Sequence, residues 1–382
     1  MKNIVDALRE VPLREGLKRE DLTRLLSEIK PLDLSNSKRC RTRWNTLCKP
    51  LYALGELEEM LMSLAGIQGT CDPELYPALA LPFFADNGVV AEGVSQCGQE
   101  VTAQVLRNMQ EGKSSLTIFA KKLGVTVCPV DVGTSDYPII SKEEEMKAGI
   151  LQRKINANGT GDLLKEPAMS EEECLQALFL GYELAKAAAD AGVKCIIGGE
   201  MGIANTTTST ALVAAHLNLK PDEITGRGAG LSDEGLARKK EVIQGALDFH
   251  KEALYDPFAC LQRLGGLDLA ALTGLYLGAT AYRIPVILDG LITYAAALTA
   301  IKLKEDVQSV LIPSHLPREG AAKEVADYLG WRPYLDLNIA LGEGAGALLL
   351  LPLLELALEE YEEMPRFDEG QVEQYEDFSQ KS

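Results

Sequence analysis

Short apolar runs separated by helical stretches constrain the fold of this chain of 382 residues more than any other feature. Six of these runs have the length and composition of strands that are buried on both faces. Between most of them lie longer stretches with apolar residues at helical spacing. Strands joined by helical crossovers predict a mostly parallel, doubly wound α/β sheet. The predicted strands are Leu81–Ala85, Val125–Val132, Val193–Ile197, Pro285–Leu288, Ser309–Ile312 and Tyr334–Ala340.

Helices are predicted between these strands and at both ends of the chain. Residues 1–65 carry apolar positions at helical spacing, and Ala347–Leu358 has the composition of a largely buried helix. Ser170, with Glu173 three residues later, forms a capping box at the start of a central helix. Pro365–Ser382 is acidic and polar, so we expect it to lie loosely over the surface or to be disordered. The central helices predicted are Gln99–Glu111, Ser170–Ala191, Thr206–Leu217 and Leu236–Ala253.

The charge balance argues against some classes of partner. A net charge of −18 and an isoelectric point near 4.8 argue against nucleic acid or an anionic membrane as the main partner. An anionic small molecule is still compatible with these values, because backbone N–H groups can bind phosphate in an acidic protein. The longest apolar stretch, Ala345–Leu354, contains Pro352 and is too short to span a bilayer.

The cysteines and histidines bear on compartment and cofactors. The eight cysteines are scattered without a C-x-x-C pair, as expected for reduced thiols, and the N-terminus has no secretion-signal pattern. Only three histidines are present, so a His-based metal site is not expected. We therefore expect a cytoplasmic protein without a metal or redox cofactor.

One carboxylate stands within a run of glycines, Leu341–Ala347, directly after the last predicted strand. Ligands bind at the carboxyl ends of strands in open α/β sheets, and glycine lets the backbone approach a ligand closely. Glu343 is therefore a candidate general base. From this segment alone, the alternative is a glycine-rich turn with a solvated glutamate.

A second carboxylate, Glu200, follows the predicted strand Val193–Ile197 and precedes Asn205 and three threonines. Asn205 is predicted to be a helix N-cap, and the threonines would place hydroxyl and N–H groups at the helix N-terminus, which suits a phosphate or carboxylate. A purely structural role is less attractive, because consecutive β-branched threonines are poor helix formers. Glu200 and Glu343 are predicted to face one pocket.

Three further segments combine glycine with polar residues. Gly226–Leu231, followed by Lys239, has the pattern of an anion nest; it is neither a Walker sequence nor a dinucleotide fingerprint, and the alternative is a flexible loop. Asp86 and Asn87 follow a predicted strand and could orient a ligand, although Asn-Gly is also an ordinary turn former. Asp289 closes another strand and is a better candidate than the isolated histidine after the next one.

Taken in order, these motifs resemble one enzyme family. Ala85–Thr102, Gly199–Thr208, Gly226–Leu231, Leu288–Gly290 and Leu341–Gly346 together resemble the nicotinate-nucleotide–dimethylbenzimidazole phosphoribosyltransferases, which activate the lower ligand of cobalamin. The resemblance covers about residues 20–365, and five ordered motifs are far more specific than any one of them.

The resemblance implies a fold and a reaction. The expected fold is a Rossmann-like parallel sheet with a small helical domain built from both chain ends, usually as a homodimer. Residues 1–65 and 346–382 would form the small domain, and residues 66–345 the α/β catalytic domain. The reaction moves phosphoribose from nicotinate mononucleotide to an aromatic base with inversion, giving an α-riboside phosphate and nicotinate.

The resemblance also implies residue roles. Glu343 would be the general base and Glu200 a second active-site carboxylate, and no cofactor is implied. The residues implied to hold phosphate and ribose are Gly202, Asn205, Thr206, Gly228, Ala229, Gly230, Lys239 and Asp289. Those implied to line the base pocket are Asp86, Asn87, Ser95, Cys97, Gln104, Ile203 and Leu341.

The sequence departs from the family pattern at several of these positions. Asn87 stands where His is common, Ala204 where Gly is common, and Ala229 where Thr is common, and Ser95–Gly98 lacks a frequent Pro. These changes leave the acceptor base open between dimethylbenzimidazole, a purine and a phenol. The alternatives are a phenol- or p-cresol-activating variant working with a paralogous subunit, a non-catalytic partner of such an enzyme, and a different nucleotide-binding oxidoreductase.

Overall fold

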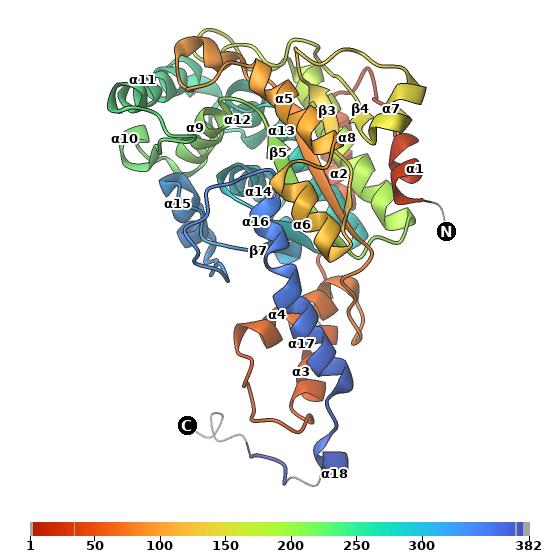
Figure 1. Cartoon of the computed structure of the whole chain (residues 1–382). Helices are drawn as coiled ribbons and strands as arrows, with labels where there is room; N and C mark the ends of the chain where they lie inside the picture. Colours follow the sequence, from red (N-terminus) through yellow and green to blue (C-terminus); the bar gives the residue numbers. More distant parts are fainter. Residues whose placement is uncertain (1–2, 34, 371–372, 377–382) are drawn as a thin grey trace.

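The computed structural model describes residues 3–33, 35–370 and 373–376, and these contain one sheet of seven parallel strands (Figure 1). The strand order is β4-β3-β1-β5-β6-β7, with β2 also paired to β1. The predicted parallel α/β sheet is therefore confirmed. The strands are β1 (Ala78–Ala85), β2 (Thr126–Val127), β3 (Val130–Gly133), β4 (Leu151–Gln152), β5 (Cys195–Met201), β6 (Val286–Leu288) and β7 (Leu311–Pro313).

Two strand predictions differ from the structure. The stretch predicted as Val125–Val132 is two strands, because Pro129 lies between β2 and β3 and has no N–H to donate to a sheet. The predicted strand Tyr334–Ala340 is wrong: it makes only an isolated bridge between Leu335 and His315. Its apolar composition is interrupted by Asn338, which has a left-handed φ of 54° and breaks an extended conformation.

Successive residues of β1 face two different hydrophobic cores, because side chains alternate along a strand. Leu79, Leu81 and Phe83 belong to the core that includes α8 (Glu171–Asp190) and α13 (Leu267–Tyr282). Ala78, Ala80 and Phe84 belong to a second core on the other face. Both faces of the sheet are therefore covered, as a doubly wound fold requires.

The remaining helices of the sheet-bearing part surround these cores (Figure 1), and the central helix predictions are confirmed to within a few residues. The capping box predicted at Ser170 and Glu173 is confirmed at the start of α8. None of the helices in the described ranges combines the length and apolar character needed to cross a membrane. The helices are α1 (Ile4–Arg9), α2 (Arg19–Glu28), α5 (Glu100–Gln110), α6 (Ser115–Leu123), α7 (Lys142–Ala148), α9 (Asn205–Leu217), α10 (Pro221–Ile224), α11 (Asp233–His250), α12 (Pro257–Leu264), α14 (Leu291–Leu303), α15 (Gly320–Leu329) and α16 (Ala345–Leu348), with 3-10 turns at Gly88–Glu92, Lys251–Ala253 and Glu305–Val310.

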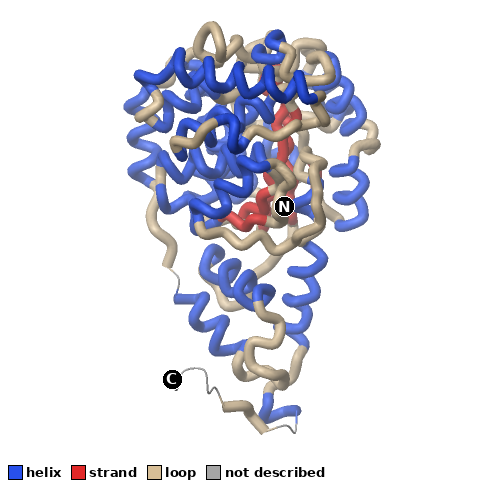
Figure 2. The backbone as a smooth tube through the Cα atoms, turned by 90° about the vertical axis from the view of Figure 1, so that its left-hand side faces the viewer, coloured by secondary structure: helices blue, strands red, loops and turns tan. Residues whose placement is uncertain are grey.

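A narrower helical part, here called the stem, projects from one end of the sheet-bearing part (Figures 1 and 2). It consists of α3 (Ser35–Trp44), α4 (Glu56–Gln68), α17 (Leu351–Glu363) and α18 (Phe367–Gly370). Segments from both ends of the sequence thus pack together, and the rings of Trp44 and Tyr361 lie 4.9 Å apart. The helices α1 and α2 instead contribute to the α8 core, and the domain boundaries themselves stay a prediction.

The C-terminal region differs from its prediction in two ways. The helix predicted over Ala347–Leu358 is two helices, α16 and α17, with Pro352 in the first turn of the second. The loose packing predicted for the tail is wrong for Pro365–Gly370, because the Cys48 backbone N–H donates a hydrogen bond to the Pro365 carbonyl and Phe367 is buried. Residues 371–372 and 377–382 of that tail lie outside the described residues.

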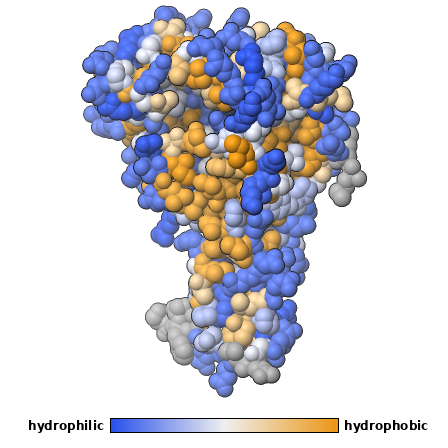
Figure 3. Space-filling model, viewed as in Figure 1, coloured by the Kyte–Doolittle hydropathy of each residue, from blue (hydrophilic) through white to orange (hydrophobic). Residues whose placement is uncertain are grey.

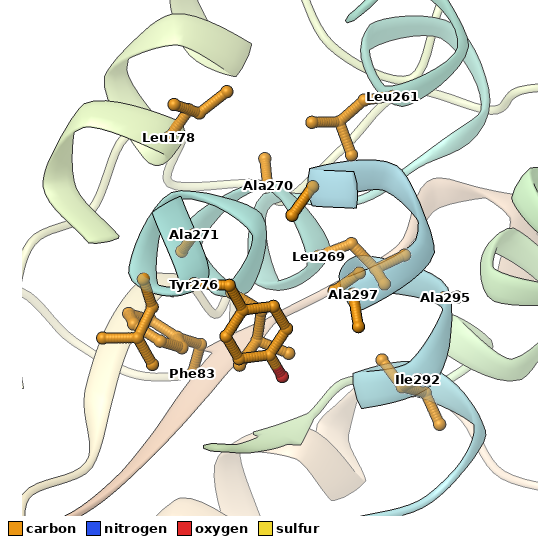
Figure 4. Close-up of a cluster of buried hydrophobic side chains, with 14 of the residues drawn as sticks. Phe83, Leu178, Leu261, Leu269, Ala270, Ala271, Tyr276, Ile292, Ala295 and Ala297 are labelled. Carbon is orange, nitrogen blue, oxygen red and sulfur yellow. The ribbon is translucent and has the colours of Figure 1, made fainter. Parts of the chain in front are cut away.

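The helices α8 and α13 approach each other closely through glycines. A Cβ atom on Gly274 of α13 would overlap the carbonyl oxygen of Leu178, and one on Gly181 of α8 would overlap that of Ala271. Figure 4 shows Leu178, Ala271 and the buried side chains around this contact, including Tyr276. The glycines therefore let α13 lie flat between α8 and the sheet.

We predict that Gly274→Ala lowers the free energy of unfolding by about 1–3 kcal/mol or more, because the methyl group cannot fit without moving a helix. The matched control is Gly320→Ala at the start of α15, where the nearest atom would be 3.4 Å from the new Cβ. Urea unfolding of both variants measures the difference. Equal stability of the two variants would contradict the close-packing argument.

Candidate active site

Carboxylates from three neighbouring strands meet at the carboxyl edge of the sheet. Asp86 follows β1, Glu200 lies in β5 and Asp289 follows β6. Parallel pairing places β1 beside β5 and β5 beside β6, so these ends share one edge. All three residues are buried.

The structure brings the turn that carries Glu343 next to Glu200. A Cβ atom on Gly342 would lie 3.4 Å from Oε1 of Glu200, and the backbone carbonyl of Glu343 lies against Gly199 too closely for a side chain there. The end of β5 and the glycine-rich turn are therefore in direct contact. Glycine at position 199 is required by this close approach.

The turn that carries Glu343 has an unusual backbone held by Asp289. Gly342, Glu343 and Gly344 have left-handed φ angles of 83°, 64° and 94°. This conformation costs a non-glycine residue roughly 1–2 kcal/mol. The N–H groups of Gly344 and Ala347 each donate a 3.1 Å hydrogen bond to the Asp289 carboxylate, one to each oxygen. Asp289 thus fixes the strained turn to the end of β6.

The Glu343 carboxylate is poised to accept a proton. It is half-buried, and its Oε2 makes no hydrogen bond with the described residues. Burial raises its pKa, the Ser114 hydroxyl opposes this rise, and the charge of Asp289 adds to it. A carboxylate with a raised pKa and a free lone pair suits a general base.

Glu200 belongs to a network with Asn205 and Asp268. The Asn205 side-chain amide donates to the Glu200 carboxylate, and also to Oδ2 of Asp268 at 3.1 Å. Burial, and then the charge of Asp268, raise the pKa of Glu200 to about 8; burial raises the pKa of Asp268 to about 6. Glu200 therefore holds a proton near neutral pH in the free protein.

The N-cap prediction for Asn205 is wrong. The helix α9 begins at Asn205 itself, and the preceding cap residue is Ala204, with a left-handed φ of 73°. The Asn205 side-chain NH2 group is turned toward the two buried carboxylates instead, because buried carboxylate oxygens need a hydrogen-bond donor.

Asp268 was not predicted from the sequence. It is the second residue of α13 and follows Gly265 and Gly266, so no apolar strand marks it as a site residue. The two glycines were the available signal, since a Cβ on Gly266 would collide with Asp268. Gly202, predicted to hold phosphate, lies beside Asp268 as well, with the place of its missing Cβ 3.0 Å from Oδ2.

Some of the predicted base-pocket residues lie together. The Ser135 backbone N–H and hydroxyl donate to Oδ2 of Asp86 at 2.8 and 2.7 Å, while Oδ1 of Asp86 and Oδ1 of Asn87 make no hydrogen bond with the described residues. Burial raises the pKa of Asp86. The N–H of Ile203 donates to the hydroxyl of Thr102, also on this side, at 3.2 Å. Two buried acceptor oxygens are therefore left without a hydrogen-bond partner among the described residues.

The other predicted base-pocket residues are less enclosed. Cys97 and Gln104 are exposed, Ser95 is half-buried, and 49% of Leu341 is exposed. The Ser95 hydroxyl accepts a hydrogen bond from the Cys97 N–H at 3.2 Å, which shapes the loop locally. No hydrogen bond within the described ranges joins these four residues to the carboxylates, so their part in base binding stays a prediction.

A cationic corner forms beside α9. Lys239 of α11 is fully buried, and its Nζ donates to the Thr206 hydroxyl at 2.8 Å. Burial lowers the pKa of Lys239 to about 8. Gly228 lies against both, since a Cβ there would be 2.8 Å from Oγ1 of Thr206 and 3.5 Å from Nζ of Lys239. The structure thus brings together Thr206, Gly228 and Lys239; we call this group the phosphate corner.

The Gly226–Leu231 loop is less open than a bare anion nest. The N–H groups of Gly230 and Leu231 both donate to the Arg227 carbonyl at 3.1 Å. The N–H of Gly228 donates to the Glu319 carboxylate, also at 3.1 Å. Among the predicted phosphate-binding residues of this loop, only the backbone N–H of Ala229 makes no hydrogen bond with the described residues.

Comparison with known proteins identifies the family. A family model described as "Phosphoribosyltransferase" matches residues 29–372. The nicotinate-nucleotide–dimethylbenzimidazole phosphoribosyltransferase of Ruminiclostridium cellulolyticum is 38% identical over 350 residues, which are 92% of this chain and 97% of that relative. The chain belongs to this phosphoribosyltransferase family.

Further relatives agree with this assignment. The enzyme of the same name from Pelodictyon phaeoclathratiforme is 42% identical over 354 residues, covering 92% of this chain and 98% of its own. The crystal structure of CobT from Thermus thermophilus superposes with a TM-score of 0.81 at 37% identity, over 89% of this chain and 99% of that one. The family resemblance and the fold predicted from the motifs are confirmed.

This phosphoribosyltransferase is a pentosyltransferase, and the family match leaves the oxidoreductase alternative without support. Among the residues that the structure describes, no three His, Cys, Asp or Glu side chains are arranged as ligands of a metal ion. The roles of the individual site residues stay predictions.

The raised pKa of Glu200 predicts a pH dependence of stability. Between its ordinary value of 4.5 and about 8, the folded protein keeps a proton that the unfolded chain has lost. The contribution of Glu200 to the free energy of unfolding therefore decreases as pH rises through this window. We predict that the free energy of unfolding of Glu200→Gln, measured relative to that of the unmodified protein, rises by more than about 1 kcal/mol between pH 5 and pH 8.

Urea unfolding at the two pH values measures this gain. The matched control is Glu359→Gln, at an exposed position of α17, which should show the same pH dependence as the unmodified protein. If the free energies of unfolding of Glu200→Gln and the unmodified protein change equally between the two pH values, Glu200 is not protonated in the folded state.

Proposed function

We propose that the protein transfers phosphoribose from nicotinate mononucleotide to an aromatic lower-ligand base with inversion at C1′. The products are an α-riboside phosphate, used in assembling the nucleotide loop of cobamides, and free nicotinate. The observation that carries the proposal is the half-buried Glu343, whose turn Asp289 anchors and whose neighbour Gly342 lies beside the Glu200 carboxylate. The names of the relatives support the choice of substrates.

The leaving group explains why a carboxylate site suits this reaction. The pyridinium nitrogen of nicotinate mononucleotide becomes neutral as its bond to C1′ breaks, so nicotinate departs without needing a proton. The ribose gains oxocarbenium character, and carboxylates nearby stabilise positive charge. The cationic pyridinium would lower the pKa of Glu200, so we expect Glu200 to release its proton when this substrate binds.

Glu343 removes a proton from the incoming base. A benzimidazole or purine bonds to C1′ through the lone pair of a ring nitrogen and loses the N–H proton of the ring, and a phenol loses its O–H proton. The unpartnered Oε2 of Glu343 is the acceptor that the structure offers. Attack from the face opposite nicotinate converts the β configuration at C1′ to α.

The phosphate corner holds the other end of the substrate. The buried ammonium of Lys239 and the hydroxyl of Thr206 supply charge and a donor, and Ala229 adds a backbone N–H. Because C1′ chemistry with this leaving group needs no electron transfer or Lewis acid, we propose that the reaction uses no metal or redox cofactor.

We further propose that the active form is a homodimer in the cytoplasm. Leu337 and Leu341, just before Glu343, are 58% and 49% exposed, and a second copy of the chain would cover them. Figure 3 shows hydrophobic residues gathered where the sheet-bearing part meets the stem. The eight cysteines are free thiols, which fits a reducing compartment.

Replacing Glu343 with Gln should lower the rate of nicotinate release by about 10²–10⁴-fold, because Gln cannot accept the proton. The assay combines nicotinate mononucleotide with dimethylbenzimidazole and measures nicotinate. The matched control, Asp336→Asn, removes a charge from an exposed position of the same segment and should leave the rate unchanged. Full activity of the Glu343→Gln variant would exclude the general-base role.

The acceptor base is tested by competition. We expect the purified chain, without a second protein, to convert dimethylbenzimidazole preferentially when adenine, phenol and p-cresol are present at equal concentration. Mass spectrometry identifies the α-ribosides, and light scattering should give about twice the 41.4 kDa mass of one chain. Turnover that appears only after a paralogous subunit is added, or phenol products alone, would favour the paired phenol-activating alternative.

A further inference from the structure

Glu319 places a negative charge in the phosphate corner. Its Oε1 accepts the 3.1 Å hydrogen bond from the N–H of Gly228, and its Oε2 is buried without a partner in the described chain. The residue lies directly before α15, far from Gly228 in sequence. The carboxylate also fills the space beside Gly226, where a Cβ atom would collide with it. A carboxylate thus occupies the position where the loop would present an N–H to an anion.

Lys239 lies on the other side of the same glycine. Its Nζ would be 3.5 Å from a Cβ on Gly228, and the hydroxyl of Thr206 is its hydrogen-bond partner. No ion pair within 4 Å joins Lys239 to a carboxylate of the described residues. The charge of Glu319 nevertheless acts on Lys239, raising its pKa against the larger lowering by burial. One cation and one anion therefore flank Gly228 without touching.

We propose that Glu319 is a resident counter-anion of the phosphate corner, which the phosphate group of a ligand must displace. This inference rests on the proposed function, because it takes the corner to be the phosphate subsite of nicotinate mononucleotide. Thr206, Gly228 and Lys239 favour phosphate binding in this corner, whereas Glu319 opposes it. Glu319 therefore sets the affinity of the subsite.

The charges make displacement necessary. A phosphate group beside Lys239 brings up to two negative charges within a few ångströms of the Glu319 carboxylate, where repulsion between partly buried like charges is strong. The single ammonium of Lys239 cannot balance both anions. The N–H of Gly228 also has only one proton to donate, so the carboxylate and the phosphate compete for it.

The structure allows Glu319 to move. It is half-buried, and at the N-cap position of α15 its side chain makes no capping hydrogen bond to that helix. Its rotation therefore leaves α15 intact and exposes the carboxylate to water. Return of the carboxylate after the reaction would then help the phosphorylated product to leave.

Calorimetric titration with inorganic phosphate at fixed ionic strength tests the proposal. Glu319→Gln keeps an oxygen that can accept from Gly228 but removes the charge, so we expect it to bind phosphate about tenfold or more tightly than the unmodified protein. The matched control is Glu324→Gln in α15, which removes the same charge without a hydrogen bond to the Gly226–Leu231 loop. The control should bind phosphate like the unmodified protein.

Unchanged or weaker phosphate binding by Glu319→Gln would overturn the proposal, and so would the absence of phosphate binding in both proteins. A second variant, Glu319→Ala, distinguishes loss of the negative charge from loss of the hydrogen bond that holds the Gly226–Leu231 loop. If the carboxylate only anchored the loop, Glu319→Ala would weaken binding and Glu319→Gln would leave it unchanged. An altered fold is excluded by circular dichroism of each variant.

The titration is separate from the proposed reaction. Nicotinate release is measured in parallel, and the Michaelis constant for nicotinate mononucleotide should fall in Glu319→Gln together with the dissociation constant for phosphate. If phosphate binds more tightly but neither protein releases nicotinate, the proposed function fails and the counter-anion stands. If nicotinate is released but Glu319→Gln binds phosphate like the unmodified protein, the proposed function stands and the counter-anion proposal fails.

Discussion

The hydrogen bonds that the Asp289 carboxylate accepts from Gly344 and Ala347 hold the active site together. They join the end of β6 to a turn whose left-handed backbone is unfavourable for Glu343 in isolation. Once this turn is fixed, its backbone fits against Gly199, and Gly342 lies beside the Glu200 carboxylate. The parallel sheet supplies the frame, and Asp289 converts a flexible glycine run into a rigid support.

Burying acidic groups beside one another is energetically unfavourable, and this raises the pKa values of the carboxylates in the site. Each of Glu200, Asp268 and Asp289 is desolvated, and the pKa of each is raised. The Asn205 amide compensates two of them, and backbone N–H groups compensate the third. A ligand with a positive ring would relieve the remaining repulsion among these carboxylates.

The sequence predicted the sheet and the central helices, because apolar runs and helical spacing are local patterns, and it singled out the segments of Glu200 and Glu343 that the structure brings together. It did not reveal Asp268, which lies at a helix start with no strand before it, or the true orientation of Asn205, which depends on two distant carboxylates. The failed strand at Tyr334–Ala340 shows the same limit: composition fitted a strand, but no neighbouring strand was there to pair with it beyond one bridge. Contacts between remote segments decided each of these cases.

The path of the chain after Glu343 has a mechanical consequence. The turn leads within two residues into α16, and α17 continues from there into the stem, where it packs against helices from the N-terminal region (Figure 1). Glu343, the proposed general base, thus lies on the same continuous stretch of chain that continues into the stem. Loosening of the stem would therefore shift Glu343, so the position of the proposed base depends on packing between the two ends of the sequence.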